Sequence, residues 1–77
     1  MEIKILGPGC PKCKTLEKLT REVVEKSGID ANVTKVDDIV AIMNYGVMTT
    51  PALVIDEKVA VKGRVPSAEE ILKLITT

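Results

Sequence analysis

The chain has 77 residues, of which 11 are basic and 11 acidic, and it contains no histidine. Balanced charge without a basic stripe argues against nucleic acid or an anionic membrane surface as a partner. The absence of histidine excludes Cys–His and Ser–His–Asp catalysis and any histidine-ligated metal. Tyr45 is the only aromatic residue, so we expect an aliphatic core in a single domain spanning residues 1–77.

The two cysteines allow at most one bridge, which is too few for a secreted scaffold built from disulfides. The first residues lead straight into a strand pattern, without a charged lead, a long apolar run or a small-residue cleavage site. The longest apolar run, residues 39–43, is far shorter than a membrane span. We therefore expect a cytoplasmic protein with no membrane partner.

Both cysteines lie where a predicted strand gives way to a predicted helix. Residues 2–6 alternate apolar and polar side chains, as a short strand does. The run GPGCPKC follows, and after it apolar residues recur at the spacing of one helical face. This pattern predicts a helix from residue 11 to about residue 26, ended by Gly28 in the left-handed conformation.

The position of the two cysteines on this helix suits redox chemistry. Pro11 fits the first helical position because it has no N–H to leave unpaired, which makes Cys10 the N-cap. Cys13 then lies one turn on, with its Cβ about 5–6 Å from that of Cys10. A disulfide needs Cα atoms about 4.4–6.8 Å apart, so the pair can close with little backbone movement. Unpaired N–H groups and the helix dipole lower the pKa of the Cys10 thiol, and Lys12 and Lys14 add positive charge. An easily opened ring with one acidified thiol is the requirement for dithiol–disulfide exchange.

The middle of the chain predicts a second strand and a short helix. Residues 31–36 alternate in the manner of a strand. Asp37 or Asp38 can cap the helix that follows, and Gly46 ends it.

The last part of the chain predicts a hairpin and a final helix. Residues 52–55 and 58–62 are strands joined by so short a turn that they must pair antiparallel. Ser67 at the N-cap and Glu70 three residues later form a capping box for the final helix. The resulting order is βαβαββα, with parallel strands in the first half and a hairpin in the second.

This order, with Cys-Pro-Lys-Cys opening the first helix and Thr50-Pro51 before the third strand, resembles the thioredoxin fold in its minimal, glutaredoxin-sized form. More closely, the chain is similar to the small archaeal and bacterial thioredoxin-like redox proteins. The resemblance implies an α/β domain with a four-stranded mixed sheet flanked by three helices. It also implies a monomeric thiol–disulfide oxidoreductase acting on protein disulfides. A thioredoxin-reductase-like donor would supply its electrons, and the disulfide would be its only redox group.

The resemblance also assigns roles to individual residues. In that family the first cysteine attacks, the second resolves the mixed disulfide, and the proline is cis and packs beside the disulfide. Those roles fall on Cys10, Cys13 and Pro51. From the residues alone a trans bond is the default, since only about 5–6% of X–Pro bonds in folded proteins are cis. Thr50 would offer its backbone to a substrate chain as an added strand. The substrate site is also expected to include Pro11 and Lys12.

The chain departs from the relatives that it resembles at three positions. Thioredoxins usually carry Trp before the first cysteine, where this chain has Gly9. Thioredoxins bury an acid in the strand before the cysteines, whereas Lys4 is the only charged residue among residues 3–6. Glutaredoxins hold glutathione with two glycines followed shortly by an acid, whereas Gly63 is followed here by Arg64. The choice between a reductase and a thiol as reductant stays open.

The alternative to redox chemistry is a soft-metal site. Small copper- and mercury-binding domains also place a CxxC after their first strand, and two thiolates suit Cu(I) or Hg(II). A structural zinc ion wants four ligands, which the chain does not offer. Those domains run βαββαβ and end on a strand, whereas this chain is predicted to end on a helix. An inert structural disulfide is a third possibility, but a loop this short constrains the unfolded chain little.

Overall fold

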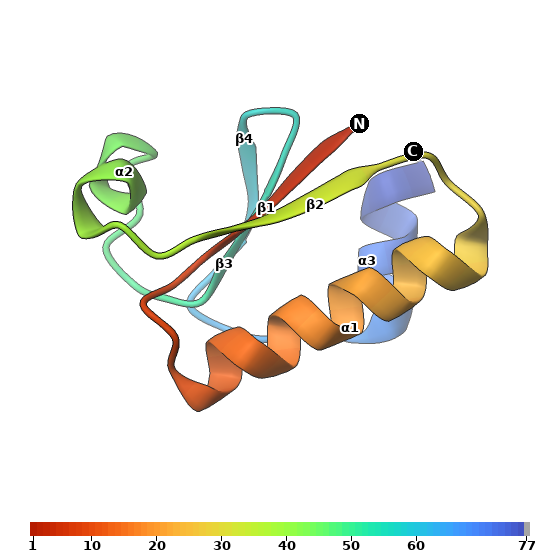
Figure 1. The fold of residues 1–77 in the computed structure, drawn as a ribbon, viewed down its shortest axis with the longest axis horizontal. Helices are drawn as coiled ribbons and strands as arrows, with labels where there is room; N and C mark the ends of the chain where they lie inside the picture. Colours follow the sequence, from red (N-terminus) through yellow and green to blue (C-terminus); the bar gives the residue numbers. More distant parts are fainter. Residues whose placement is uncertain (77) are drawn as a thin grey trace.

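The structure, a computed structural model, describes residues 1–76 as a four-stranded sheet with three helices (Figure 1). Along the chain these elements are β1 (Glu2–Leu6), α1 (Pro11–Ser27), β2 (Asn32–Val36), α2 (Ile39–Asn44), β3 (Ala52–Ile55), β4 (Lys58–Lys62) and α3 (Ala68–Thr76). The order and the mixed sheet confirm the predicted fold class. No helix within residues 1–76 has both the length and the apolar character needed to cross a membrane.

The sheet has the strand order β2-β1-β3-β4. β1 and β2 are parallel, because the long crossover through α1 lets the chain return in the same direction. β1 and β3 are antiparallel, with Leu6 opposite Ala52. The end of β1 therefore lies beside the start of β3. This register brings the loop that carries the cysteines next to the loop that carries Pro51.

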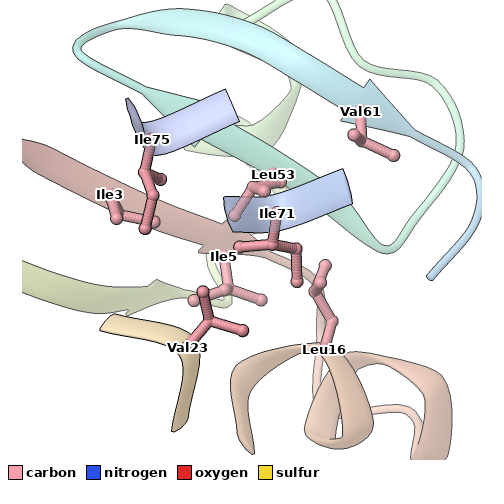
Figure 2. Packing of buried hydrophobic residues seen from close by; sticks show 8 residues of the cluster. All are labelled: Ile3, Ile5, Leu16, Val23, Leu53, Val61, Ile71 and Ile75. Carbon is pink, nitrogen blue, oxygen red and sulfur yellow. The ribbon is translucent and has the colours of Figure 1, made fainter. Parts of the chain in front are cut away.

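Helices cover both faces of the sheet, with α1 and α3 on one face and α2 on the other (Figure 1). Successive residues of a strand point to opposite faces. Ile3 and Ile5 accordingly face α1 and α3, and Leu6 faces α2. Figure 2 shows the larger cluster, in which side chains of β1 and β3 interleave with those of α1 and α3. Its buried members are Ile3, Ile5, Leu16, Val23, Leu53, Val61, Ile71 and Ile75.

The helix ends follow the predicted local chemistry. Cys10 is the N-cap of α1 and Pro11 its first residue, as expected. Gly28 ends α1 with a left-handed backbone at φ 71°, a conformation that glycine adopts without steric cost. Asp38 caps α2, its Oδ1 accepting a hydrogen bond from the Val40 N–H over 3.2 Å.

The start of α3 differs in one respect from the predicted capping box. Ser67 Oγ accepts a hydrogen bond from the Glu70 N–H over 3.2 Å, as expected. Both carboxylate oxygens of Glu70, however, accept hydrogen bonds from the Arg64 guanidinium rather than completing the box. A bidentate, charge-assisted pair is stronger than a hydrogen bond to one neutral N–H, so the Glu70 carboxylate pairs with the Arg64 guanidinium.

Candidate active site

Cys10 and Cys13 form a disulfide at the start of α1, with their Cα atoms 5.0 Å apart. The Cys10 backbone is extended, and its Sγ accepts a hydrogen bond from the Cys13 N–H over 3.2 Å. Cys10 is partly exposed, whereas Cys13 is only 2% exposed. Pro11 and Lys12, between them, are exposed. The two sulfurs are therefore unequal, one reachable from outside and the other enclosed.

Gly7 lies directly against the enclosed sulfur. The residue follows the last residue of β1, and its N–H donates to the Val36 carbonyl over 2.9 Å. A Cβ added at Gly7 would overlap the Cys13 Sγ and would lie 3.9 Å from the Thr50 Cβ. The Cys13 sulfur and Thr50 therefore both lie near Gly7, on the side where a β-carbon would project. Sequence reasoning missed it, although a glycine closing a buried strand is a signal of close backbone approach.

The Pro51 loop lies at the same end of the sheet. The Thr50–Pro51 peptide bond is cis, and Pro51 is buried. Because Leu6 is opposite Ala52, the next residues outward in the antiparallel register are Gly7 and Pro51. The Pro51 carbonyl accepts a hydrogen bond from the Gly63 N–H over 2.9 Å, which ties the loop to the end of β4.

The structure thus brings together several residues that the sequence had singled out. Cys13 and Thr50 both approach Gly7 where a β-carbon would project, and the sheet register places Pro51 beside Gly7. The start of α1 adds Cys10, Pro11 and Lys12. Among residues 1–76, the side chains of these three make one hydrogen bond, in which Cys10 Sγ accepts the Cys13 N–H.

An apolar groove opens beside this end of the sheet. It has a volume of about 280 Å³. Pro8 and Thr50 come from the two loops of the cysteine site, and the remaining lining comes from α2 and the segment that follows it. We call this the α2 groove; its lining residues are Pro8, Ile39, Ile42, Met43, Val47, Met48 and Thr50.

Comparisons with known proteins decide the family. A family model described as a thioredoxin domain matches residues 1–76. The chain belongs to the thioredoxin domain family. It is 41% identical over 76 residues to a thioredoxin of Methanothermobacter thermautotrophicus, an alignment that covers 99% of each chain. It is also 41% identical over 69 residues to a thioredoxin of Methanocaldococcus jannaschii, covering 90% of this chain and 79% of that one.

Membership in the thioredoxin family settles the general activity. The chain is a disulfide oxidoreductase, as the CxxC at a helix start had predicted. The disulfide at the N-terminus of α1 is the group in the structure able to accept or give two electrons in such exchange. Within residues 1–76 no three Cys, Asp or Glu side chains gather closely enough to hold a metal ion.

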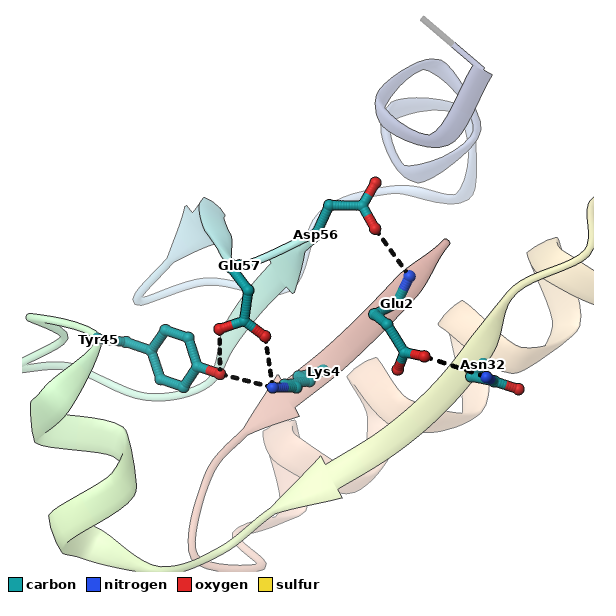
Figure 3. A network of polar contacts seen from close by, with 6 residues as sticks. All are labelled: Glu2, Lys4, Asn32, Tyr45, Asp56 and Glu57. Carbon is teal, nitrogen blue, oxygen red and sulfur yellow. Dashed lines mark hydrogen bonds and ion pairs between the residues drawn. The ribbon is translucent and has the colours of Figure 1, made fainter.

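A polar network occupies the α2 side of the sheet in this thioredoxin-family chain (Figure 3). The Lys4 Nζ donates to Tyr45 Oη over 2.8 Å and to Glu57 Oε1 over 2.6 Å. Tyr45 Oη in turn donates to Glu57 Oε2 over 2.9 Å, closing a triangle. The hydrogen bonds to Glu57 and then Tyr45 raise the pKa of Lys4, and those from Lys4 and then Tyr45 lower the pKa of Glu57. The charge of Lys4, unexpected in this strand, is therefore matched by Glu57.

Proposed function

We propose that this chain exchanges its Cys10–Cys13 pair with disulfides of partner proteins, as a single monomeric domain of the cytoplasm. One observation carries the proposal: the two sulfurs differ in exposure and in hydrogen bonding. Cys10 is partly exposed and accepts the Cys13 N–H, whereas Cys13 is 2% exposed. An exposed sulfur whose negative charge is stabilised suits the attacking role. An enclosed sulfur beside it suits the resolving role, which needs no access from outside.

The exchange proceeds in two steps. The Cys10 thiolate attacks one sulfur of the partner's disulfide, the partner's S–S bond breaks, and a mixed disulfide forms as a partner thiolate leaves. Cys13 then loses its proton and attacks the Cys10 sulfur, which releases the second partner thiolate. The two thiolates take up protons, so the partner gains two electrons and two protons while the Cys10–Cys13 disulfide forms. The Cα separation of 5.0 Å in the disulfide lies within the range that disulfides ordinarily have.

The surroundings of the cysteines supply the substrate site in this proposal. Thr50 is a partly exposed residue near Gly7, and its backbone offers hydrogen bonds to an extended partner segment. Pro51 shapes the loop, and Pro11 and Lys12 present their exposed side chains to the same partner. A thioredoxin-reductase-like protein restores the dithiol.

Trapping the mixed disulfide tests the proposal. Reduced Cys13→Ser protein mixed with insulin should accumulate a covalent complex through Cys10, read by mass spectrometry and lost on adding dithiothreitol. Cys10→Ser is the matched control and should trap far less, because its remaining thiol is enclosed. Equal trapping by the two variants would contradict the assigned roles. No complex with Cys13→Ser, together with no insulin reduction by the native chain, would contradict the function.

A further inference from the structure

The α2 groove gathers the most exposed apolar side chains of the described chain. Among residues 1–76 the four most exposed large hydrophobic side chains are Met48 at 89%, Val40 at 64%, Ile39 at 60% and Met43 at 58%. Three of them line the groove, and Val40 lies next to Ile39 on the same short helix. α2 carries no charged residue, although 29% of the whole chain is charged. An exposed apolar cluster of this kind marks an interaction site.

The position of the groove identifies its occupant, given the proposed function. Pro8 lies two residues before Cys10, a span of at most about 7 Å. Thr50, the other loop residue of the lining, approaches Gly7 on the same side as the Cys13 sulfur. A partner that brings a disulfide to Cys10 therefore places the residues flanking that disulfide near Pro8 and Thr50. The groove is therefore continuous with the site of exchange, and the partner's own chain beside its reacting cysteine fills it.

Methionine gives this groove a chemical sensitivity that leucine or valine would not. The thioether is flexible and polarizable, so it adapts to varied apolar partners. Oxidation to the sulfoxide turns it into a polar group that disrupts apolar contacts. We propose that Met43 and Met48 bind the apolar side chains next to the partner's reacting cysteine, and that peroxide switches this binding off by oxidising them.

The step balances with hydrogen peroxide as the oxidant. The thioether sulfur attacks one peroxide oxygen and keeps it, the O–O bond breaks, and the other oxygen leaves as water. The sulfur loses two electrons and the peroxide gains them. While Cys10 and Cys13 are joined as a disulfide, neither offers a thiolate to peroxide, whereas Met43 and Met48 remain exposed. The groove can therefore respond to oxidant separately from the cysteines.

The experiment treats the disulfide form of the native chain with hydrogen peroxide and then restores the dithiol with dithiothreitol, which leaves the sulfoxides in place. Mass spectrometry counts the sulfoxides, and two rates are measured before and after treatment. One is kcat/KM for insulin; the other is the rate with hydroxyethyl disulfide, too small to reach across the groove. The insulin rate should fall about fourfold per sulfoxide, as for the loss of one buried methylene contact, and the small-disulfide rate should not change.

A Met43→Leu, Met48→Leu double variant provides the matched control, each protein being compared with its own untreated rate. It keeps Met1, which is 40% exposed and precedes β1 at the end opposite the cysteines. In this double variant peroxide can oxidise only Met1, and this should leave the rate of insulin reduction unchanged. The inference would be overturned if the native chain carrying both sulfoxides reduced insulin at its untreated rate. It would also be overturned if peroxide lowered the insulin rate of the double variant as much as that of the native chain. Failure to reduce insulin before any peroxide would instead contradict the proposed function on which the inference rests.

Discussion

Gly7 and Cys13 pack so closely that a β-carbon on Gly7 would overlap the sulfur of Cys13. Gly7 is not among the residues with positive φ, so space rather than backbone conformation calls for glycine there. The contact joins the end of β1 to the first turn of α1. Thr50 approaches Gly7 on the same side as the sulfur, with its Cβ 3.9 Å from the position that a β-carbon on Gly7 would take.

The first prediction concerns this contact. Gly7→Ala should lower the free energy of unfolding of the disulfide form by about 1–3 kcal/mol, because the added methyl overpacks a filled space. Urea denaturation measures the change. The cost should shrink in a Cys13→Ala background, which removes the sulfur. It should persist in a Cys10→Ala background, which removes the disulfide but keeps the Cys13 sulfur. Equal costs in all three backgrounds would show that the Cys13 sulfur is not the obstacle.

The second prediction concerns the two thiols. In the reduced protein Cys10 should react with iodoacetamide well before Cys13, and at lower pH than free cysteine does. The Cys13 N–H and the start of α1 stabilise the Cys10 thiolate, whereas Cys13 is 2% exposed. Mass mapping of partly alkylated protein gives the order, and the preference should vanish in urea. Reaction at Cys13 first would reverse the assigned roles.

The third prediction separates redox from metal chemistry. Zinc should bind the reduced monomer weakly, because Cys10 and Cys13 supply only two of the four ligands that a structural zinc site needs. Insulin reduction should therefore proceed unchanged in metal-free buffer that contains a chelator. Tight stoichiometric Cu(I) binding by a chain that reduces no disulfide would favour the metal-carrier alternative.

The fourth prediction concerns a buried hydroxyl. Thr20, on α1, is fully buried, and its Oγ1 has no hydrogen-bond partner within residues 1–76. Thr20→Val keeps the shape and removes the unmet polar group, so it should raise the free energy of unfolding by about 1 kcal/mol. Thr15→Val is the matched control, since Thr15 is exposed and its Oγ1 donates to the Pro11 carbonyl over 3.0 Å. A loss of stability in Thr20→Val would mean that the hydroxyl is satisfied in solution.

The fifth prediction concerns acid stability. Lys4 and Tyr45 lower the pKa of Glu57 below its ordinary value of 4.5. Glu57 therefore contributes stability that is fully present above pH 4.5 and is lost as the pH falls through the lowered pKa. The pKa of Lys4 is raised, so its pH dependence has the opposite sign. Lys4 contributes stability that is fully present below pH 10.5 and is lost only as the pH rises through the raised pKa. Between pH 4.5 and pH 10.5 the contribution of this pair to the free energy of unfolding should not change with pH.

Urea unfolding at a series of pH values checks this sign. Glu57→Gln should reduce the loss of stability that the native chain shows below pH 4.5. Glu70 should account for part of the remaining loss, because Arg64 lowers its pKa as well. Glu22→Gln, at an exposed position of α1 with no ion pair among residues 1–76, is the control and should follow the native curve. Identical acid curves for Glu57→Gln and the native chain would contradict the role of the triangle.

Much of the fold was predictable because its signals are local. Alternation marked β1, the helical spacing of apolar residues marked α1, and the short turn marked the hairpin of β3 and β4. Pro11 and Gly28 were recognisable as helix ends because capping depends on residues a few positions apart. Cys10 and Cys13 stood out as a redox pair by spacing alone, whereas the interest of Thr50 and Pro51 came from a family resemblance.

The tertiary structure alone decided how distant segments meet. Lys4 pairs with Tyr45 and Glu57, which are 41 and 53 residues away, because the sheet and α2 bring their side chains to one face. Gly7 meets Cys13 because the end of β1 and the first turn of α1 pack in contact. The α2 groove likewise forms only where the cysteine loop and α2 lie side by side. No local pattern encodes such meetings, because sheet register and core packing set them across the whole chain.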